Sequence, residues 1–293
     1  MDRALILGDT GKLGRALKET FRGAFEVVGW SRGSGLDAGD FPGLSRLLEE
    51  HRPSLVINAV ALMGIEACEQ QPERAFHLNA SLPRHLARLS QELGFKLIHF
   101  SSDAVFDDSK AGLPRMESDP PRPLNTYGMT KFSGDCYVQA ESSAHYVFRL
   151  SVLLGTCLQG DQFVEKMVAR VRAGERHLRI AEDVLCSPSF VLDVAGRVFQ
   201  TVIQSAPWGL YHTANDGKAS LYELADQVRK GLDLDVTLER ASHRDFAKGA
   251  RRSIHTFLGT EKQAPLRDWR EAVRAYCCQV KVSESSSPSL GSS

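Results

Sequence analysis

The sequence predicts an α/β fold, a Rossmann-type doubly wound parallel sheet with a smaller, interleaved C-terminal substrate lobe. Three observations predict it. Short apolar runs alternate with longer amphipathic stretches in the first half, a glycine-rich turn follows the first run, and the alternation loosens after about residue 151. Strand and helix in alternation build a parallel sheet through right-handed crossovers. Because helices cover both faces of such a sheet, its strands are apolar almost throughout.

The first half carries the elements of this sheet. Its apolar runs predict strands at 4–8, 26–30, 54–60, 96–102 and 146–151. The stretches between them have the apolar spacing of helices, at 12–21, 43–51, 72–93 and 126–140. We therefore expect residues 1–151 to form a dinucleotide-binding domain.

The second half is expected to supply mainly the substrate lobe, over residues 152–280. Helices are predicted at 162–174, 189–205 and 220–232, and a strand at 208–216. The last of these helices begins at Ser220 with an acidic residue three positions on, which is a capping-box start. We expect about 190–215 to complete the sheet, and the serine-rich tail, 281–293, to be disordered.

The overall charge and composition argue against several classes of partner. Lysine plus arginine and aspartate plus glutamate number 36 each, so the formal charge is zero and neither nucleic acid nor a membrane surface is expected as a partner. No apolar run approaches the roughly 20 residues of a membrane span. The six cysteines show no C-x-x-C pairing and no histidine at zinc spacing, so no metal is expected. These features favour a cytoplasmic protein with reduced thiols.

The turn "ILGDTGKLG" places three glycines where the first strand meets the first helix. Such a turn lets backbone N–H groups approach a pyrophosphate at the positive end of the helix, although a tight turn without ligand is the alternative. The spacing G-x-x-G-x-x-G resembles that of the extended short-chain dehydrogenase/reductase family. The expected cofactor-binding residues of the turn are Gly8, Thr10, Gly11, Lys12, Leu13 and Gly14.

The end of the second strand bears on the choice of cofactor. An acidic residue there would bind the ribose hydroxyls of NAD, whereas an arginine accommodates the 2′-phosphate of NADP. Here Ser31 and Arg32 occupy the position, and Asp37 lies too far along to compete. We therefore expect NADPH as cofactor, with Ser31 and Arg32 contacting it; a solvated loop arginine is the alternative.

The pair Tyr127 and Lys131 lies four residues apart in "NTYGMTKFSG", so both side chains share one face of a helix. An ammonium beside a phenol lowers the pKa of the phenol towards neutral pH, where proton transfer is most effective. Lys131 can also hydrogen-bond the nicotinamide ribose. A half-buried tyrosine with a solvated lysine is the alternative.

Ser102 ends the strand "KLIHFSS", at the edge where ligands of a parallel sheet collect. With Tyr127 and Lys131 it completes the catalytic triad of the family that the chain resembles. The expected reaction is hydride delivery from NADPH to a ketone, with Tyr127 protonating the oxygen and Ser102 orienting it. The resemblance further implies that Asn58 and Ala59 line the cofactor.

Five segments together look like the dTDP-4-dehydrorhamnose reductase branch of that family: "HRPSLVINAVA", "CEQQPERAFHLNA", "IHFSSDAVFDD", "PLNTYGMTK" and "GLYHTAN". The resemblance implies a nucleotide-linked 4-keto-6-deoxysugar as substrate and assigns Asn79 a supporting place in the site. Ala104 stands where the branch has a tyrosine, and Val152 where it has a tryptophan, so sugar-stacking area is lost. The expected substrate-binding residues are Ser102, Asp103, Ala104 and Val152.

Two other readings of the same resemblance stay open. One is a nucleotide-sugar epimerase or dehydratase that retains NAD, against which Arg32 argues. The other is an NADP-binding regulatory subunit like the beta subunit of methionine adenosyltransferase. Arg251 and Arg252 could meet a diphosphate or form a solvated surface. A homodimer is possible, and the exact sugar is left open.

Overall fold

The computed structural model describes residues 1–35, 37–156, 162–246 and 249–285. At its centre is a six-stranded parallel sheet in the order β10, β5, β4, β3, β1, β2. The strands are β1 (Arg3–Leu7), β2 (Glu26–Trp30), β3 (Leu55–Asn58), β4 (Lys96–Ser102), β5 (His145–Leu150) and β10 (Gly209–His212). The predicted fold class is confirmed. The chain runs from β1 to β2 on one side and then crosses to β3 on the other side of β1. The direction in which strands are added therefore reverses at β1, and doubly wound sheets bind their ligands at such a reversal.

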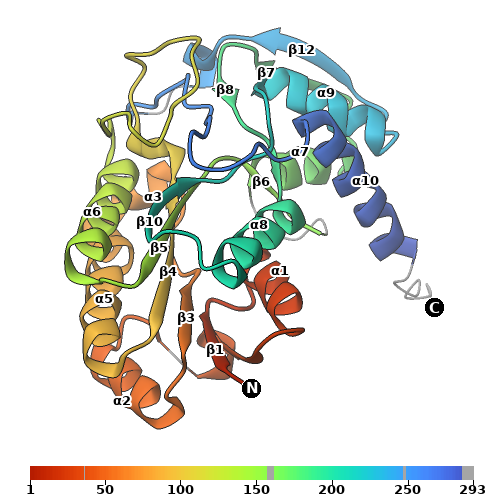
Figure 1. Ribbon diagram of the computed structural model, residues 1–293. Coiled ribbons are helices and arrows are strands. Elements are labelled where there is room, and N and C mark those ends of the chain that lie inside the picture. The colour runs from red at the N-terminus through yellow and green to blue at the C-terminus, as the bar shows by residue number, and fades with distance from the viewer. Residues whose placement is uncertain (36, 157–161, 247–248, 286–293) are drawn as a thin grey trace.

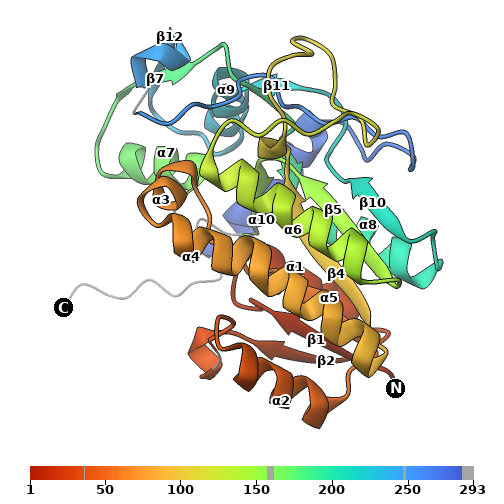
Figure 2. The ribbon, with the colours of Figure 1, turned by 90° about the vertical axis from the view of Figure 1, so that its left-hand side faces the viewer.

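Helices cover both faces of the sheet (Figure 1). One face carries α1 (Lys12–Phe21) and α8 (Val191–Ile203), packed on apolar side chains of β1, β4 and β5. The other carries α2 (Phe41–His51), α5 (Leu82–Leu93) and α6 (Thr126–Glu141). Figure 2 shows α5 and α6 lying side by side across the sheet. Burial on both faces accounts for the continuous apolar strands.

The helix expected over 72–93 is interrupted. It consists of α4 (Pro72–Phe76), a π-helical turn (His77–Ser81) and α5. A π turn inserts a residue into the helical ladder, which apolar periodicity alone does not reveal, and such turns occur frequently at functional sites. Here the turn contains Asn79, which is fully buried.

The C-terminal lobe, named the substrate lobe after its expected role, lies beyond one end of the sheet, at the top of Figure 1. Its apolar core joins α7, α9 and α10 with β7 and β12, two parallel strands about sixty positions apart in the chain. These elements are α7 (Phe163–Arg172), β7 (His177–Ala181), α9 (Leu221–Gly231), β12 (Thr237–Ala241) and α10 (Trp269–Ser285). Two short pairs complete it: β6 (Leu153–Leu154) with β9 (Ser189–Phe190), and β8 (Leu185–Cys186) with β11 (Ala219–Ser220).

Three details of this half refine the expectations. The capping box at the start of α9 is confirmed, because Glu223 N donates to Ser220 Oγ at 3.1 Å and Ser220 N donates to Glu223 Oε2 at 2.8 Å. Helix α8 begins at Val191, since the two residues before it pair with β6. The expectation of disorder from residue 281 was wrong for 281–285, where α10 continues past the buried Val280; 286–293 lie outside the described residues.

No helix in the described part of the chain is long and apolar enough to cross a membrane. Five cysteines are free thiols, namely Cys68, Cys136, Cys186, Cys277 and Cys278. The sixth, Cys157, lies outside the described residues.

Candidate active site

The three expected catalytic residues come from neighbouring elements. Ser102 is the last residue of β4, while Tyr127 and Lys131 lie on the first two turns of α6, which packs against β4. Asn125 begins the helix by accepting a hydrogen bond from Gly128 N at 2.9 Å. The Ser102 hydroxyl is close enough to the Tyr127 phenol to interact with it. The structure therefore brings the triad together.

Gly128 explains how α6 comes so close to the end of β4. A β-carbon at this position would lie 2.1 Å from the carbonyl oxygen of Ala104, so only glycine allows this approach. Ala104 belongs to the turn (Asp103–Val105) that follows Ser102 directly. The sequence interpretation missed this role, although the glycine stands next to the tyrosine in the motif.

Tyr127 is almost enclosed, with 8% of its surface exposed. Burial raises the pKa of its phenol; the hydrogen bond of Ser102 opposes this rise, and the charge of Asp103 adds to it. The expected lowering of the Tyr127 pKa was therefore wrong, because enclosure in the protein penalises the phenolate more than its neighbours stabilise it. The phenol consequently carries its proton at neutral pH.

Lys131 is fully buried, and its ammonium donates to the carbonyl oxygen of Phe100 at 2.5 Å. Burial lowers the pKa of Lys131 to about 8, and the carboxylate of Asp135 opposes this shift. Asp135 follows four positions later on the same helix face. Its carboxylate accepts a hydrogen bond from Arg149 Nε at 3.1 Å, and both side chains are buried. A buried ion pair thus lies one helical turn from the lysine and acts on its charge, which the sequence interpretation did not foresee.

Ser102 and Asp103 form a tightly bonded corner. Ser102 Oγ donates to Asp103 Oδ1 at 3.1 Å and accepts from Ala104 N at 3.1 Å. The other carboxylate oxygen of Asp103 accepts from Ser151 Oγ at 2.7 Å and from Thr256 Oγ1 at 3.1 Å. Burial raises the Asp103 pKa and these hydrogen bonds oppose it. Asp103 therefore ties the end of β4 to the lobe, which positions the Ser102 hydroxyl.

Asn79 fixes the loop after β3. Its side-chain oxygen accepts from Leu62 N at 2.8 Å, and its amide nitrogen donates to Leu62 O at 3.1 Å and to Thr130 Oγ1 at 3.2 Å. Asn58 accepts from Val60 N at 3.2 Å and is itself almost fully buried. Ala59, the next residue, lies against the glycine turn. A β-carbon on Gly8 would be only 3.1 Å from the Ala59 carbonyl. Both asparagines thus act on the backbone that lines the site.

The glycine turn fits a dinucleotide phosphate. Gly8 has a φ of +81°, which favours glycine, and Gly11 N donates to Gly8 O at 3.1 Å to close the turn. A β-carbon on Gly14 would lie 2.1 Å from Gly8 O, so α1 can pack this closely only without a side chain there. Thr10 is exposed on the turn. The start of α1 therefore presents backbone rather than side chains, as an approaching pyrophosphate requires.

Lys12 and Leu13 have partners within the protein. The ammonium of Lys12 donates to Glu165 Oε1 at 2.6 Å and to Leu153 O at 3.0 Å, both in the substrate lobe. Leu13 packs partly against the core between α1 and the sheet. The lysine of the cofactor turn therefore also connects the two halves of the molecule. Its long-range partner Glu165 could not be identified from sequence spacing.

Ser31 and Arg32 lie just beyond the end of β2, as expected. Ser31 caps a short turn (Arg32–Ser34), and Arg32 is exposed at that edge. An acidic group that the sequence interpretation did not consider also lies near the strand. The carboxylate of Asp9 packs on Gly29 and pairs with Lys18 Nζ at 2.6 Å.

The remaining expected substrate contacts differ in their surroundings. Ala104 packs beside Tyr127, whereas Val152 packs against the core of the substrate lobe. Arg252 is half-exposed and forms an ion pair with Glu66 on α3 (Ile65–Gln70), a helix that was not predicted. The carbonyl of the exposed Arg251 accepts from Asn125 Nδ2 at 3.0 Å.

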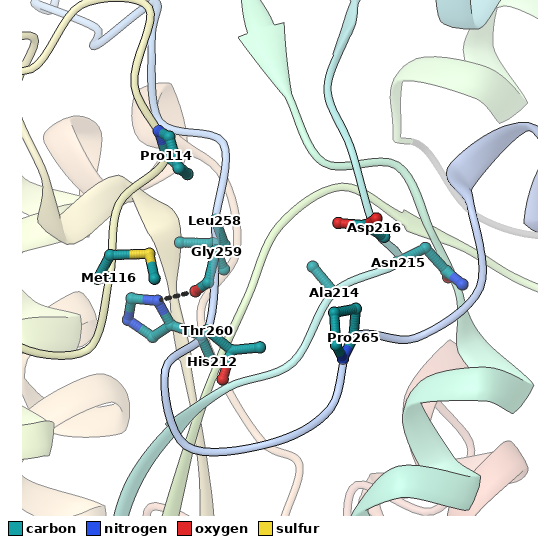
Figure 3. A pocket seen from close by; sticks show the side chains of 10 residues that line it. All are labelled: Pro114, Met116, His212, Ala214, Asn215, Asp216, Leu258, Gly259, Thr260 and Pro265. Atoms are coloured by element: carbon teal, nitrogen blue, oxygen red, sulfur yellow. Dashed lines mark hydrogen bonds between the residues drawn. The ribbon is translucent and has the colours of Figure 1, made fainter.

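A separate cavity of about 170 Å³ lies past the end of β10 (Figure 3). Met116, Leu258 and Thr260 line one side of it, and Asp216 and Pro265 the other. None of the triad lines it, and its volume is below the roughly 300–1,000 Å³ of ordinary ligand pockets. It is therefore distinct from the edge of the sheet that carries Ser102, Tyr127 and Lys131.

The protein is an extended short-chain dehydrogenase/reductase in its fold and in the layout of its site. Comparison with known sequences makes this specific: the chain belongs to the family described as the RmlD substrate binding domain, whose model matches residues 2–282.

Relatives and solved structures agree with this family. The chain is 31% identical to the dTDP-4-dehydrorhamnose reductase of Streptomyces griseus, over 92% of this chain and 91% of the relative. It is 32% identical to a probable dTDP-4,6-dihydroxy-2-methyloxan-3-one 4-ketoreductase of Streptomyces antibioticus, over 93% of each. A crystal structure of a dTDP-4-dehydrorhamnose reductase from Clostridium acetobutylicum superposes with a TM-score of 0.86 at 28% identity, covering 94% of this chain and 98% of that one.

Proposed function

We propose that the protein reduces the C4 ketone of a nucleotide-linked 6-deoxysugar with NADPH. The observation that carries the proposal is the placement of Ser102, Tyr127 and Lys131 at one edge of a dinucleotide-binding sheet. Relatives that are 31–32% identical over nearly the whole chain are named as reductases of dTDP-linked keto sugars, which supports this substrate class. Arg32 and the absence of a carboxylate directly at the end of β2 support NADPH.

The residues of the turn would hold the cofactor. Gly8, Gly11 and Gly14 leave room for the pyrophosphate at the start of α1, and Arg32 lies where a 2′-phosphate would be met. NADPH, when bound, supplies the hydride that the ketone carbon accepts.

The proton comes from the protein. When the substrate binds, the Ser102 hydroxyl turns from Asp103 Oδ1, donates its one proton to a hydrogen bond with the ketone oxygen and so orients it. Tyr127 transfers its phenolic proton to that oxygen, and the ammonium of Lys131 stabilises the phenolate that remains. The raised pKa of Tyr127 suits this direction of reaction, because the group must be protonated when the substrate arrives. The product is an alcohol.

The epimerase alternative has less support. A UDP-glucose 4-epimerase from Thermus thermophilus superposes with a TM-score of 0.79, but its 18% identity shows only a shared fold. The regulatory-subunit alternative rests on the same family resemblance. Turnover separates both alternatives from a reductase, because neither consumes NADPH stoichiometrically.

The test is NADPH consumption with dTDP-4-dehydrorhamnose, for the wild type and Tyr127→Phe. We expect the variant to lose at least about 10²-fold in kcat, the usual contribution of a general acid, while binding of NADPH measured by fluorescence is retained. Tyr137→Phe, on the same helix beneath the Arg84 guanidinium, is the matched control and should keep full activity. Binding of NADPH without turnover by the wild type, or an active Tyr127→Phe, contradicts the proposal.

A further inference from the structure

Met63 lies directly at the group that would protonate the substrate. The Tyr127 hydroxyl donates to Met63 Sδ at 3.6 Å. Although Met63 is a large apolar residue, 53% of its surface is exposed. Met63 is thus open to solvent and also contacts the Tyr127 hydroxyl. It therefore borders the space through which a ketone would reach that hydroxyl.

The backbone on both sides of Met63 is held in place. Leu62 N and Leu62 O are both bonded to the side chain of Asn79, and Cys68 Sγ donates to the same carbonyl at 3.4 Å. On the other side, Gly64 has a φ of +94°, a conformation that favours glycine, and begins α3. The loop therefore directs the Met63 side chain towards Tyr127, and only its flexible thioether end is free to adjust.

The surroundings of the phenol on this side are apolar. Tyr127 packs in one cluster with Cys68, Ala75, Leu62, Ile65 and Ala104. Met63 extends this apolar surface outward to the rim of the site. A thioether is only a weak hydrogen-bond acceptor. A hydroxyl group that packs against Met63 therefore loses its hydrogen bonds to water without gaining comparable ones from the protein.

We propose that Met63 is a specificity-determining residue, which contacts the substituent on the carbon next to the ketone and favours a methyl group over a hydroxymethyl group. This inference rests on the proposed function and deepens it, because it assigns recognition of the 6-deoxy position to one side chain. When the ketone oxygen takes the hydrogen bond of Tyr127, the thioether moves off the hydroxyl and packs on the adjacent methyl. Burying a hydroxyl there without a partner weakens binding.

The experiment compares two ligands that differ only in the C6 hydroxyl, dTDP-6-deoxyglucose and dTDP-glucose. Their dissociation constants are measured by calorimetry with NADP-saturated protein, so the readout does not need turnover. We expect the wild type to prefer the deoxy ligand by about 10- to 100-fold, the range over which apolar pockets discriminate such pairs. Met63→Gln should reduce the preference to about threefold or less, since its amide can pair with the hydroxyl.

Two further variants keep the test decisive. Met63→Leu should retain the wild-type preference, because the contact remains apolar. Met129→Gln, at a similarly exposed methionine on α6, should leave the preference unchanged. An unchanged preference in Met63→Gln, or no preference in the wild type, overturns the inference even if dTDP-4-dehydrorhamnose is reduced. Absence of that reduction with an intact, Met63-dependent preference instead overturns the proposed reaction.

Discussion

The dinucleotide-binding half and the substrate lobe use their charged residues differently. In the first, Asp135 and Arg149 pair in the interior, 0% and 3% exposed, one helical turn from Lys131. In the lobe, ion pairs such as Arg179 with Asp245 lie on the surface, with side chains 50% and 37% exposed. A buried charge shifts the pKa of its neighbours strongly, whereas an exposed pair is screened by water. The buried pair in the first half therefore acts more strongly on the charge of its neighbours than the surface pairs of the lobe do.

The two halves also differ in how they are assembled. In the first, β1 pairs with both β2 and β3, and β4 lies between β3 and β5; Ser102 on β4 and the Tyr127–Lys131 pair on α6 come from elements that pack together. The lobe core joins α7, α9 and α10 across more than a hundred residues. The Lys12–Glu165 ion pair crosses between the halves, with side chains 12% and 2% exposed. Substitutions can test this contrast, beginning with the one that should have the largest effect.

Gly14→Ala should be the most damaging change. Its β-carbon would meet the backbone of Gly8 at 2.1 Å, so either the turn or α1 must shift. We expect a loss of about 3 kcal/mol in the free energy of unfolding, typical of overpacking, and a loss of NADPH binding of at least about tenfold. Denaturant unfolding and fluorescence titration measure the two effects.

The matched control for this change is Gly23→Ala, where no atom lies within 4 Å of an added β-carbon. It should be near neutral. Equal losses in both variants would show that the close approach at Gly14 is unimportant.

Asp135→Asn should come next, because it removes one charge of the buried pair while keeping its shape. We expect a loss of about 2 kcal/mol in the free energy of unfolding, below the 3–5 kcal/mol for removing a partner entirely. The pKa of Lys131 is about 8, and the Asp135 carboxylate raises it against the effect of burial. Without that negative charge the pKa falls, so the alkaline limb of the kcat–pH profile should move to lower pH.

Glu141→Gln controls for a lost carboxylate on the same helix, since Glu141 pairs with Arg84 and Arg88 at the surface. Its pH profile should match that of the wild type. An unshifted alkaline limb in Asp135→Asn would mean that the carboxylate does not act on Lys131.

Asp183→Asn, in the substrate lobe, should have a smaller effect that depends on pH. Burial acts to raise the pKa of Asp183, but hydrogen bonds from His243 and Ser242 outweigh it and lower the pKa to about 2. The stabilisation is thus present above the unfolded pKa of about 4 and is lost as pH falls through about 2. Because the carboxylate is a third exposed, we expect at most about 1 kcal/mol at neutral pH.

Unfolding of Asp183→Asn and the wild type at pH 7 and pH 2 measures this difference, which should shrink on acidification. A difference that stays constant between the two pH values would contradict the assignment. His243→Asn tests the same contact from the other side and should reproduce part of the loss.

Lys230→Gln should have the smallest effect. Lys230 pairs with Asp226 one helical turn away at 2.7 Å, on the surface of α9. Such pairs contribute about 0.3–0.5 kcal/mol, and glutamine keeps nearly the same helix propensity. A change above about 1 kcal/mol in urea unfolding would show that surface charge in the lobe matters as much as buried charge in the other half.

Local patterns were sufficient for the fold and for the placement of Ser102, Tyr127 and Lys131 near one another. The alternation of strands and helices and the glycine turn predict the doubly wound sheet, and the spacing of Tyr127 and Lys131 follows from helical geometry. That Ser102 ends a strand predicts its place at the ligand edge. These inferences need only neighbours within one turn or one strand.

The sequence by itself thus determined the layers, the glycine turn between β1 and α1, and the placement of Ser102, Tyr127 and Lys131 near one edge of the sheet, because these follow from local periodicity. Only the tertiary structure decided that the pKa of Tyr127 rises rather than falls, that Lys12 meets Glu165, and that Met63 contacts the Tyr127 hydroxyl. The pKa of a group depends on how completely distant segments enclose it, and a contact depends on which segments the fold brings together. Neither quantity is encoded in the spacing of residues along the chain.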